Sequence, residues 1–264
     1  MQQRGGMASR GLPAALVVFG LGTAAAPAAA APALEAFRLA PIDDASRIEI
    51  DVAGIAELAG DFQAAGSTVT YRQVLGPVVL SADVGAVVVR TAGASEILGN
   101  NVVLGVAPWF GGRLHRGVVR TSVTIASGDL QYDPSLAAEA WVVDSRRYAP
   151  GEHGLALALG YRYGTDRRFV QTEAGFDAHE AHTEHSHFPL QLTAWLGAGA
   201  GAAIDERTAV VGELVARLEP RSYALVALGV RRETAIGELS VRAEAQLSHG
   251  DLVGLAARYT YRFD

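Results

Sequence analysis

The sequence predicts an all-β protein, a closed antiparallel up-and-down β-barrel of about twelve strands, with ten or fourteen strands as the alternatives. Two observations predict this fold. Apolar and polar residues alternate with a period of two over segments of ten to thirteen residues, and aromatic residues gather at the ends of the best of these segments. Successive side chains of a strand point to opposite faces, so each segment has one apolar and one polar face.

The clearest segments lie at the C-terminal end of the chain. Residues 237–248 alternate throughout, residues 248–251 form a predicted turn, and residues 253–263 alternate again up to Phe263. In the first of these segments, one face carries Leu239, Val241, Ala243, Ala245 and Leu247, and the other carries Ser240, Arg242, Glu244, Gln246 and Ser248. This pair of segments predicts a β-hairpin with one apolar surface.

The same alternation recurs towards the N-terminus. Clear segments are 48–52, 78–88, 155–163, 190–197 and 207–219, and weaker candidates are 97–110, 117–127, 136–147, 168–177 and 222–232. Between residues 68 and 91, Gly76-Pro77 is either a turn or a kink in one long strand.

Segment length and aromatic placement distinguish a membrane barrel from a soluble β-sandwich. Sandwich strands usually have about five or six residues, whereas a strand that crosses a bilayer needs about nine to eleven. The aromatic residues on the apolar faces at the segment ends are Tyr161, Tyr163, Tyr259, Tyr261 and Phe263. Aromatic rings at both interfaces are typical of lipid-facing strands, so we predict a transmembrane barrel.

From about residue 46 to its end, the chain resembles bacterial outer-membrane β-barrel proteins, and a small porin-like barrel among them. The final strand is similar to the assembly signal of that family, although Phe263 is penultimate and Asp264 follows it. The resemblance implies an outer-membrane location. It also implies outer-membrane lipids, lipopolysaccharide and the barrel-assembly machinery as partners.

The N-terminus has the organisation of a secretory signal. Arg4 and Arg10 precede an apolar stretch from Leu12 to about Ala26, and the small residues of 24–31 suit signal-peptidase cleavage. A buried N-terminal helix is the weaker interpretation, because Gly and Pro interrupt the stretch. We therefore predict a cleaved signal peptide at 1–30, a periplasmic lead-in at 31–45 and the barrel at 46–264.

Composition excludes several classes of protein. The chain has 264 residues, a formal net charge of −6, and no Cys, and all its basic residues are Arg. Without Cys, a lipoprotein anchor, a disulfide framework and a thiolate nucleophile are excluded. A nucleic-acid partner is not expected, because nucleic-acid binding requires a basic face.

Bacterial single-chain barrels have an even number of strands, short periplasmic turns and longer outer loops. Counting strands back from the C-terminus puts the turn 248–251 on the outer side of the membrane. The count, which includes strand 136–147, also places Gly111–Arg116 outside and Gly128–Ser135 in the periplasm. The five aromatic residues named above then lie at the periplasmic rim, and Trp109, Phe110 and Phe188 at the outer rim.

The polar faces of the strands must point into the barrel, because a charge facing lipid costs a few kcal/mol. The residues predicted to line the lumen and set its selectivity are Glu49, Asp51, Asp83, Arg162, Glu213, Arg217, Arg242, Glu244, Arg258 and Arg262; Glu139 is predicted to point inward too. Such charges either pair across a filled barrel or line a water-filled path that selects solutes. Small inward residues, among them Gly160 and Gly197, favour an internal space.

A His-rich segment, 176–187, lies in a predicted outer loop. Neutral imidazole and carboxylate groups are standard zinc donors. The candidate ligands for Zn²⁺ or Cu²⁺ are His179, His182, His185 and His187. A solvated polar loop and a proton-dependent surface patch are the alternatives. No other cofactor is expected.

Three functions remain open at this stage. The favoured one is a passive porin-like channel for small solutes, and the second is a structural or metal-binding barrel with a filled lumen. A lipid-modifying enzyme is the third, since Ser186 lies between His185 and His187, and Ser248 precedes His249. Adjacent side chains on a strand point to opposite faces, which argues against a nucleophile–base pair, so the prediction is that the protein is not an enzyme.

Overall fold

The computed structural model describes a set of antiparallel strands joined by turns and loops. The described residues are 39, 42, 45–58, 60–91, 94–99, 101–112, 114–125, 153–165, 167–180, 190–218, 223–247 and 252–263. The strands are β1 (Ser46–Glu57), β2 (Gln63–Leu75), β3 (Val78–Thr91), β4 (Ala94–Gly99), β5 (Val102–Gly111), β6 (His115–Ile125), β7 (Gly154–Gly164), β8 (Arg168–Glu180), β9 (Leu190–Ala203), β10 (Thr208–Leu218), β11 (Tyr223–Thr234), β12 (Gly237–Gln246) and β13 (Leu252–Phe263).

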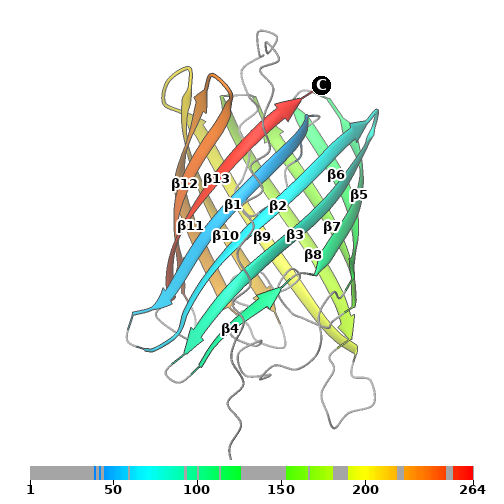
Figure 1. The fold of residues 1–264 in the computed structure, drawn as a ribbon. Coiled ribbons are helices and arrows are strands. Elements are labelled where there is room, and N and C mark those ends of the chain that lie inside the picture. Colours follow the sequence, from blue (N-terminus) through cyan, green and yellow to red (C-terminus); the bar gives the residue numbers. More distant parts are fainter. Residues whose placement is uncertain are drawn as a thin grey trace, which may run out of the picture.

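These strands close into a barrel of twelve antiparallel positions (Figure 1). Closure is made by β1, which pairs with β2 on one side and with β13 on the other. β4 and β5 pair with successive parts of the same edge of β3 and together fill one position. The predicted closed barrel of about twelve strands is confirmed. Among the described residues, no helix is long and apolar enough to cross a membrane.

Gly76-Pro77 is a turn and not a kink. It joins β2 to β3, which pair from Leu75 with Val78 next to the turn to Gln63 with Arg90 at the other end. Gly76 has a φ of +60°, a backbone conformation that glycine adopts without the steric penalty of a Cβ atom. The ambiguous segment 68–91 therefore contains the end of β2 and the whole of β3.

The two faces of each strand have opposite chemistry, and the apolar face is the outer one. Leu159, Leu228 and Leu255 on the outside are between 60% and 68% exposed, whereas Arg47 and Arg242 on the inside are 0% and 5% exposed. A soluble protein buries its aliphatic side chains and exposes its charges. This barrel does the reverse, which is the arrangement of a protein whose outer surface contacts hydrocarbon.

All turns between described strands at the rim that carries the end of β13 are short; we call this rim the C-terminal rim. Its turns are residues 76–77, 112–114, 165–167, 204–207 and 235–236. The opposite rim, the loop rim, carries longer connections, including 126–153 and 181–189. Short turns at one end and longer loops at the other are typical of outer-membrane barrels, in which the short turns are periplasmic.

One of these turns illustrates how a short connection is stabilised. The Asp205 carboxylate accepts hydrogen bonds from the backbone N–H groups of Arg207 and Thr208, both at 2.7 Å. The hydrogen bond from the Arg207 backbone is the main reason that the pKa of Asp205 lies below its ordinary value. The charged carboxylate thus favours the turn at neutral pH.

The C-terminal rim carries a belt of outward-facing aromatic residues. Tyr71 stacks on Phe263 with ring centroids 5.9 Å apart, and Tyr161 contacts His115 Nδ1 through its hydroxyl at 2.7 Å. Tyr163, Tyr259 and Tyr261 lie at the same end of their strands. The predicted grouping of Tyr161, Tyr163, Tyr259, Tyr261 and Phe263 at one rim is what the structure shows.

The predicted placement of Gly111–Arg116 and of two aromatic residues at the outer rim is wrong. Trp109 and Phe110 lie at the end of β5, and the 112–114 turn is on the C-terminal rim. The reason is that β6 pairs directly with β7, for example Val123 with Leu155. The two strands are therefore neighbours in the barrel with no strand position between them, so every earlier strand runs opposite to the direction given by the count. The predicted periplasmic turn Gly128–Ser135 lies outside the described residues. The predicted strand 136–147, Glu139 and Phe188 lie outside the described residues.

Three residues of the predicted lead-in are described, Leu39, Ile42 and Ala45. Leu39 and Ile42 lie inside the barrel, 2% and 3% exposed, against inward-facing residues of the strands. This part of the 31–45 segment therefore contacts the inner wall.

Candidate functional site: a charged lumen

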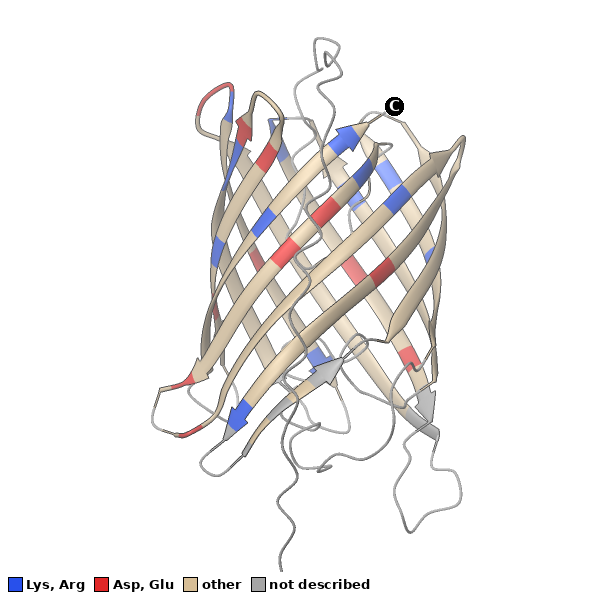
Figure 2. Ribbon diagram, viewed as in Figure 1, with Lys and Arg blue, Asp and Glu red and all other residues tan. Residues whose placement is uncertain are grey.

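The inner wall of the barrel is the candidate site, and strand alternation alone positions its side chains. The ten residues predicted for the lumen lie on the inward faces of β1, β3, β7, β10, β12 and β13. Figure 2 shows charged positions along the strands, including the middle of the barrel. In lipid-facing positions these charges would be costly, so their burial inside the wall is what a membrane barrel requires.

The densest group of charges lies on the wall formed by β12, β13 and β1; we call it the Asp51 cluster. Arg242 Nη1 lies 2.9 Å from Asp51 Oδ2, and Arg258 Nε lies at the same distance from the same oxygen. Arg258 also lies 3.6 Å from Glu49, and Arg242 contacts Glu244 through Nε. Two guanidinium groups thus share one carboxylate, and these ion pairs join side chains of β12, β13 and β1.

Further ion pairs extend this wall toward the C-terminal rim. Arg231 Nε donates to Glu238 Oε1 at 2.7 Å, and Arg262 Nη2 lies 3.2 Å from Glu238 Oε2. Arg47 Nε lies 2.6 Å from Glu49 Oε1. Positive and negative side chains therefore alternate along this wall from the middle of the barrel to the C-terminal rim.

A second group lies on the wall formed by β6 to β10; we call it the Glu173 cluster. Arg120 Nη2 lies 3.0 Å from Glu173 Oε2, and Trp195 Nε1 donates to the other Glu173 oxygen at 3.1 Å. Arg217 Nη2 lies 3.1 Å from Asp177 Oδ2. Glu173 is thus held by a cation and an indole from two different strands.

The ion pairs named in the two clusters follow the wall and do not cross the barrel. Arg242 and Asp51 are separated by one intervening strand, as are Arg120 and Glu173, and Arg217 and Asp177. The remaining named pairs join adjacent strands or residues of one strand. Pairing across the diameter would fill the interior, whereas these ion pairs run along the circumference of the barrel.

Several members of these clusters are not among the residues predicted from the sequence. Glu173 was not singled out because the alternation of 168–177 is weak: inward positions include Phe169 and Gly175. The sequence predicts an outer loop over 176–187, but β8 continues to Glu180 and places Asp177 inside the barrel. Arg47, Arg120, Arg231 and Glu238 were also missed, although strand parity alone puts each on an inward face.

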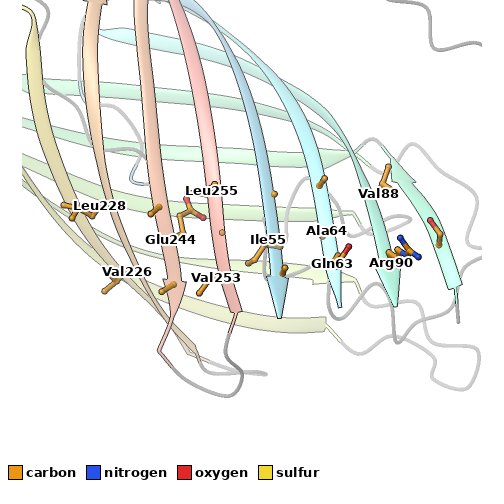
Figure 3. Close-up of a pocket in the computed structure, with 17 residues that line it drawn as sticks. Ile55, Gln63, Ala64, Val88, Arg90, Val226, Leu228, Glu244, Val253 and Leu255 are labelled. Carbon is orange, nitrogen blue, oxygen red and sulfur yellow. The ribbon is translucent and has the colours of Figure 1, made fainter. Parts of the chain in front are cut away.

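A groove of about 1100 Å³ lies on the outer surface near the loop rim (Figure 3). Outward-facing Val88, Val226, Leu228 and Leu255 border it, and small outward residues of β1, β2 and β12 form its floor. Most of these side chains belong to the apolar exterior, but Glu244 of the Asp51 cluster also lines the groove.

The predicted metal ligands remain untested. His182, His185 and His187 lie outside the described residues, as does the side chain of His179. Within the described part of the chain, no group of three or more His, Cys, Asp or Glu side chains is arranged to hold a metal ion. The Ser186 and Ser248 candidates also lie outside the described residues.

Fold and lumen together define the class: a twelve-position β-barrel with an apolar exterior and a charged interior. No protein-family model matches the sequence, and comparison with curated proteins gives no match. Among solved structures, the KdgM porin in complex with disordered oligogalacturonate aligns with a TM-score of 0.53 at 11% identity, over 82% of this chain and 99% of that one.

The NanC porin aligns with a TM-score of 0.54 at 8% identity, over 81% of this chain and 99% of that chain. LpxR from Salmonella typhimurium aligns with a TM-score of 0.51 at 11% identity, over 81% of this chain and 100% of that one. At these identities the likeness shows a shared fold, and the small porin-like barrel expected from the sequence is the architecture found.

Proposed function

We propose that the protein is a passive channel for small hydrophilic solutes in the bacterial outer membrane. The observation that carries the proposal is the arrangement of the lumen: buried charges of both signs are paired along the wall, inside a barrel whose exterior is apolar. Two of the structures that share this fold are porins. Charged rings or walls around a water-filled path select solutes by charge and size.

The solute class follows from the lining. One matching porin is described in complex with oligogalacturonate, an observation that belongs to that protein. In the present chain, the Asp51 cluster combines two arginines with three carboxylates, and the Glu173 cluster combines both signs too. We propose that such a mixed lining passes hydrophilic solutes with weak charge selectivity, and that the protein is not an enzyme.

Export and partners complete the proposal. Residues 1–30 would direct export and be removed, and the barrel-assembly machinery would insert residues 46–264. The apolar exterior would contact outer-membrane phospholipid and lipopolysaccharide. The binding of Zn²⁺ or Cu²⁺ by the His-rich segment stays a separate prediction, because the described residues do not include the ligands.

Ion conductance tests the channel directly. The purified, folded mature protein is reconstituted into planar bilayers, and current is recorded in KCl under an applied voltage. We expect discrete conductance steps. Protein that is folded and inserted, as judged by heat-dependent migration in gels, but passes no resolvable current would contradict the proposal.

A further inference from the structure

The groove on the outer surface runs across the strands, along rows of residues that face one another in register. Gly54 of β1 lies opposite Leu255 of β13 and Ala65 of β2, and Ala65 in turn lies opposite Val88 of β3. The outward-facing residues with the smallest side chains along the groove are Gly54, Ala56, Ala65, Ala243 and Ala245. Between leucine and valine side chains, these small residues leave a depression in the apolar exterior.

The two ends of the groove differ in polarity. Val226 and Leu228 of β11 lie at one end, and Gln63 and Arg90 lie at the other, together with Ser95 (Figure 3). Arg90 of β3 is the register partner of both Gln63 on β2 and Ser95 on β4, and all three side chains are exposed. An amide, a guanidinium and a hydroxyl group can each donate hydrogen bonds. The polar end therefore presents three donors and one positive charge.

The polar end is the one nearest the loop rim. Arg90 is the next-to-last residue of β3, whereas Leu228 lies five residues beyond the first residue of β11. In Figure 1, β1, β2 and β3 are tilted from upper right to lower left, so a row perpendicular to them descends towards the loop rim from β1 to β3. Arg90 thus lies near the level of the lipid headgroups, where an outward-facing charge costs little.

The apolar part of the groove has the length of one acyl chain. Neighbouring strands lie about 4.8 Å apart, so the three spacings from Leu255 on β13 through β1 and β2 to Val88 on β3 cover about 14 Å. The hydrocarbon core of a bilayer is about 30 Å thick, so an acyl chain of one leaflet reaches about 15 Å. Methylene groups lying over Gly54 and Ala65 would also contact the flanking leucine and valine side chains.

One lining residue carries a negative charge. Glu244 faces the interior of the barrel, where it contacts Arg242 through Nε. From β12 to β3 there are four strand spacings, so Glu244 is about 19 Å from Arg90 along the wall. That distance exceeds the screening length of about 8 Å in physiological salt. Glu244 therefore does not oppose an anion at Arg90.

We propose that this groove binds lipid A, the phosphorylated and acylated part of lipopolysaccharide, with one acyl chain in the groove and a phosphate group on Arg90. Guanidinium groups bind phosphate through paired, charge-assisted hydrogen bonds, and Gln63 and Ser95 supply further donors. The loop rim is the outer side of the membrane, and lipopolysaccharide forms the outer leaflet of a bacterial outer membrane. The inference rests on the proposed outer-membrane orientation and is independent of conduction.

Native mass spectrometry of the purified, folded barrel measures the binding. The protein in detergent is mixed with lipid A that carries two phosphates, with lipid A stripped of phosphate, or with phosphatidylglycerol. We expect wild type to retain lipid A with two phosphates and to retain the other two lipids far less. Arg90→Gln should weaken lipid A binding about tenfold, because the charge that contacts phosphate is lost. Arg232→Gln is the matched control, since Arg232 is an exposed, outward-facing arginine near the opposite rim, and it should bind as wild type does.

A second pair of variants tests the groove without changing its charge. Ala65→Leu fills the floor between Gly54 and Val88 and should weaken lipid A binding. Ala257→Leu enlarges an outward-facing alanine of β13 outside the groove and should not. Heat-dependent migration in gels shows that each variant is folded.

Four results would overturn the site: wild-type binding by Arg90→Gln, wild-type binding by Ala65→Leu, equal retention of phosphate-free lipid A, or equal retention of phosphatidylglycerol. A dimer without bound lipid would also overturn it, because the groove would then be an interface between two copies of the chain. None of these measurements uses current. A barrel that binds lipid A as expected but does not conduct would support the site and contradict only the proposed channel.

Discussion

Arg242 is the residue on which the Asp51 cluster depends most. It contacts carboxylates of two strands, Asp51 at 2.9 Å and Glu244 through Nε, and its own side chain is almost fully buried. A buried cation that neutralises two carboxylates sets the local sign of the field on its wall. Its removal would leave the wall with an excess of negative charge.

Arg242→Gln is therefore expected to shift the channel towards cations. The glutamine keeps hydrogen-bonding capacity but removes the charge, so Asp51 and Glu244 act more strongly on passing ions. The measurement is the reversal potential across a KCl gradient. Arg232→Gln is the control, since Arg232 is exposed on the outer side of β11 near the rim. Identical shifts in both variants would show that the Asp51 cluster does not face the conduction path.

At the scale of single strands, β2 separates the two environments within one peptide unit. Thr68 faces inward and is 5% exposed, whereas Val69 faces outward and is 41% exposed, in the middle of the strand. Thr68 also lies opposite Asp51 on β1. The same substitution at these neighbouring positions therefore meets lipid in one case and a carboxylate in the other.

Val69→Arg is expected to destabilise the folded barrel by about 2–4 kcal/mol, the cost of arginine near the bilayer midplane. Thr68→Arg should cost clearly less, because its guanidinium can reach Asp51 in the lumen. Equilibrium unfolding by guanidinium chloride in lipid vesicles measures both. Equal losses of stability, or a larger loss for Thr68→Arg, would mean that the faces of β2 are assigned the wrong way round.

The strands also show what the sequence could and could not predict. Alternation alone predicts which face of β1, β7, β12 and β13 points outward. In the middle of each of these strands, every outward-facing residue is apolar. Glu173 and Asp177 were missed because Phe169 and Gly175 occupy inward positions of β8, where Phe169 packs against Leu39 and Gly175 lies beside Trp195. Local patterning cannot anticipate residues whose environment is set by a distant segment.

For the whole molecule, the strand count survived an error in orientation. The count places the predicted strand 136–147 between the strands that are β6 and β7 in the structure, but these two strands pair directly with each other. The directions of all earlier strands are therefore reversed in the count, and Gly111–Arg116 is placed at the wrong rim. Strand pairing between β6 and β7 is a long-range property that periodicity does not encode. The contacts of Leu39 and Ile42 with the inner wall are long-range too, and the 31–45 segment carries no periodic pattern.

The central claim is that this barrel turns apolar side chains to hydrocarbon and encloses water. The chain has no Cys, so single thiols at Thr68 and Val69 report directly on the two faces. In lipid vesicles, a membrane-impermeant maleimide should modify Thr68→Cys and leave Val69→Cys unmodified until the bilayer is dissolved and the protein unfolded. Protection of Thr68→Cys together with rapid modification of Val69→Cys would contradict the account.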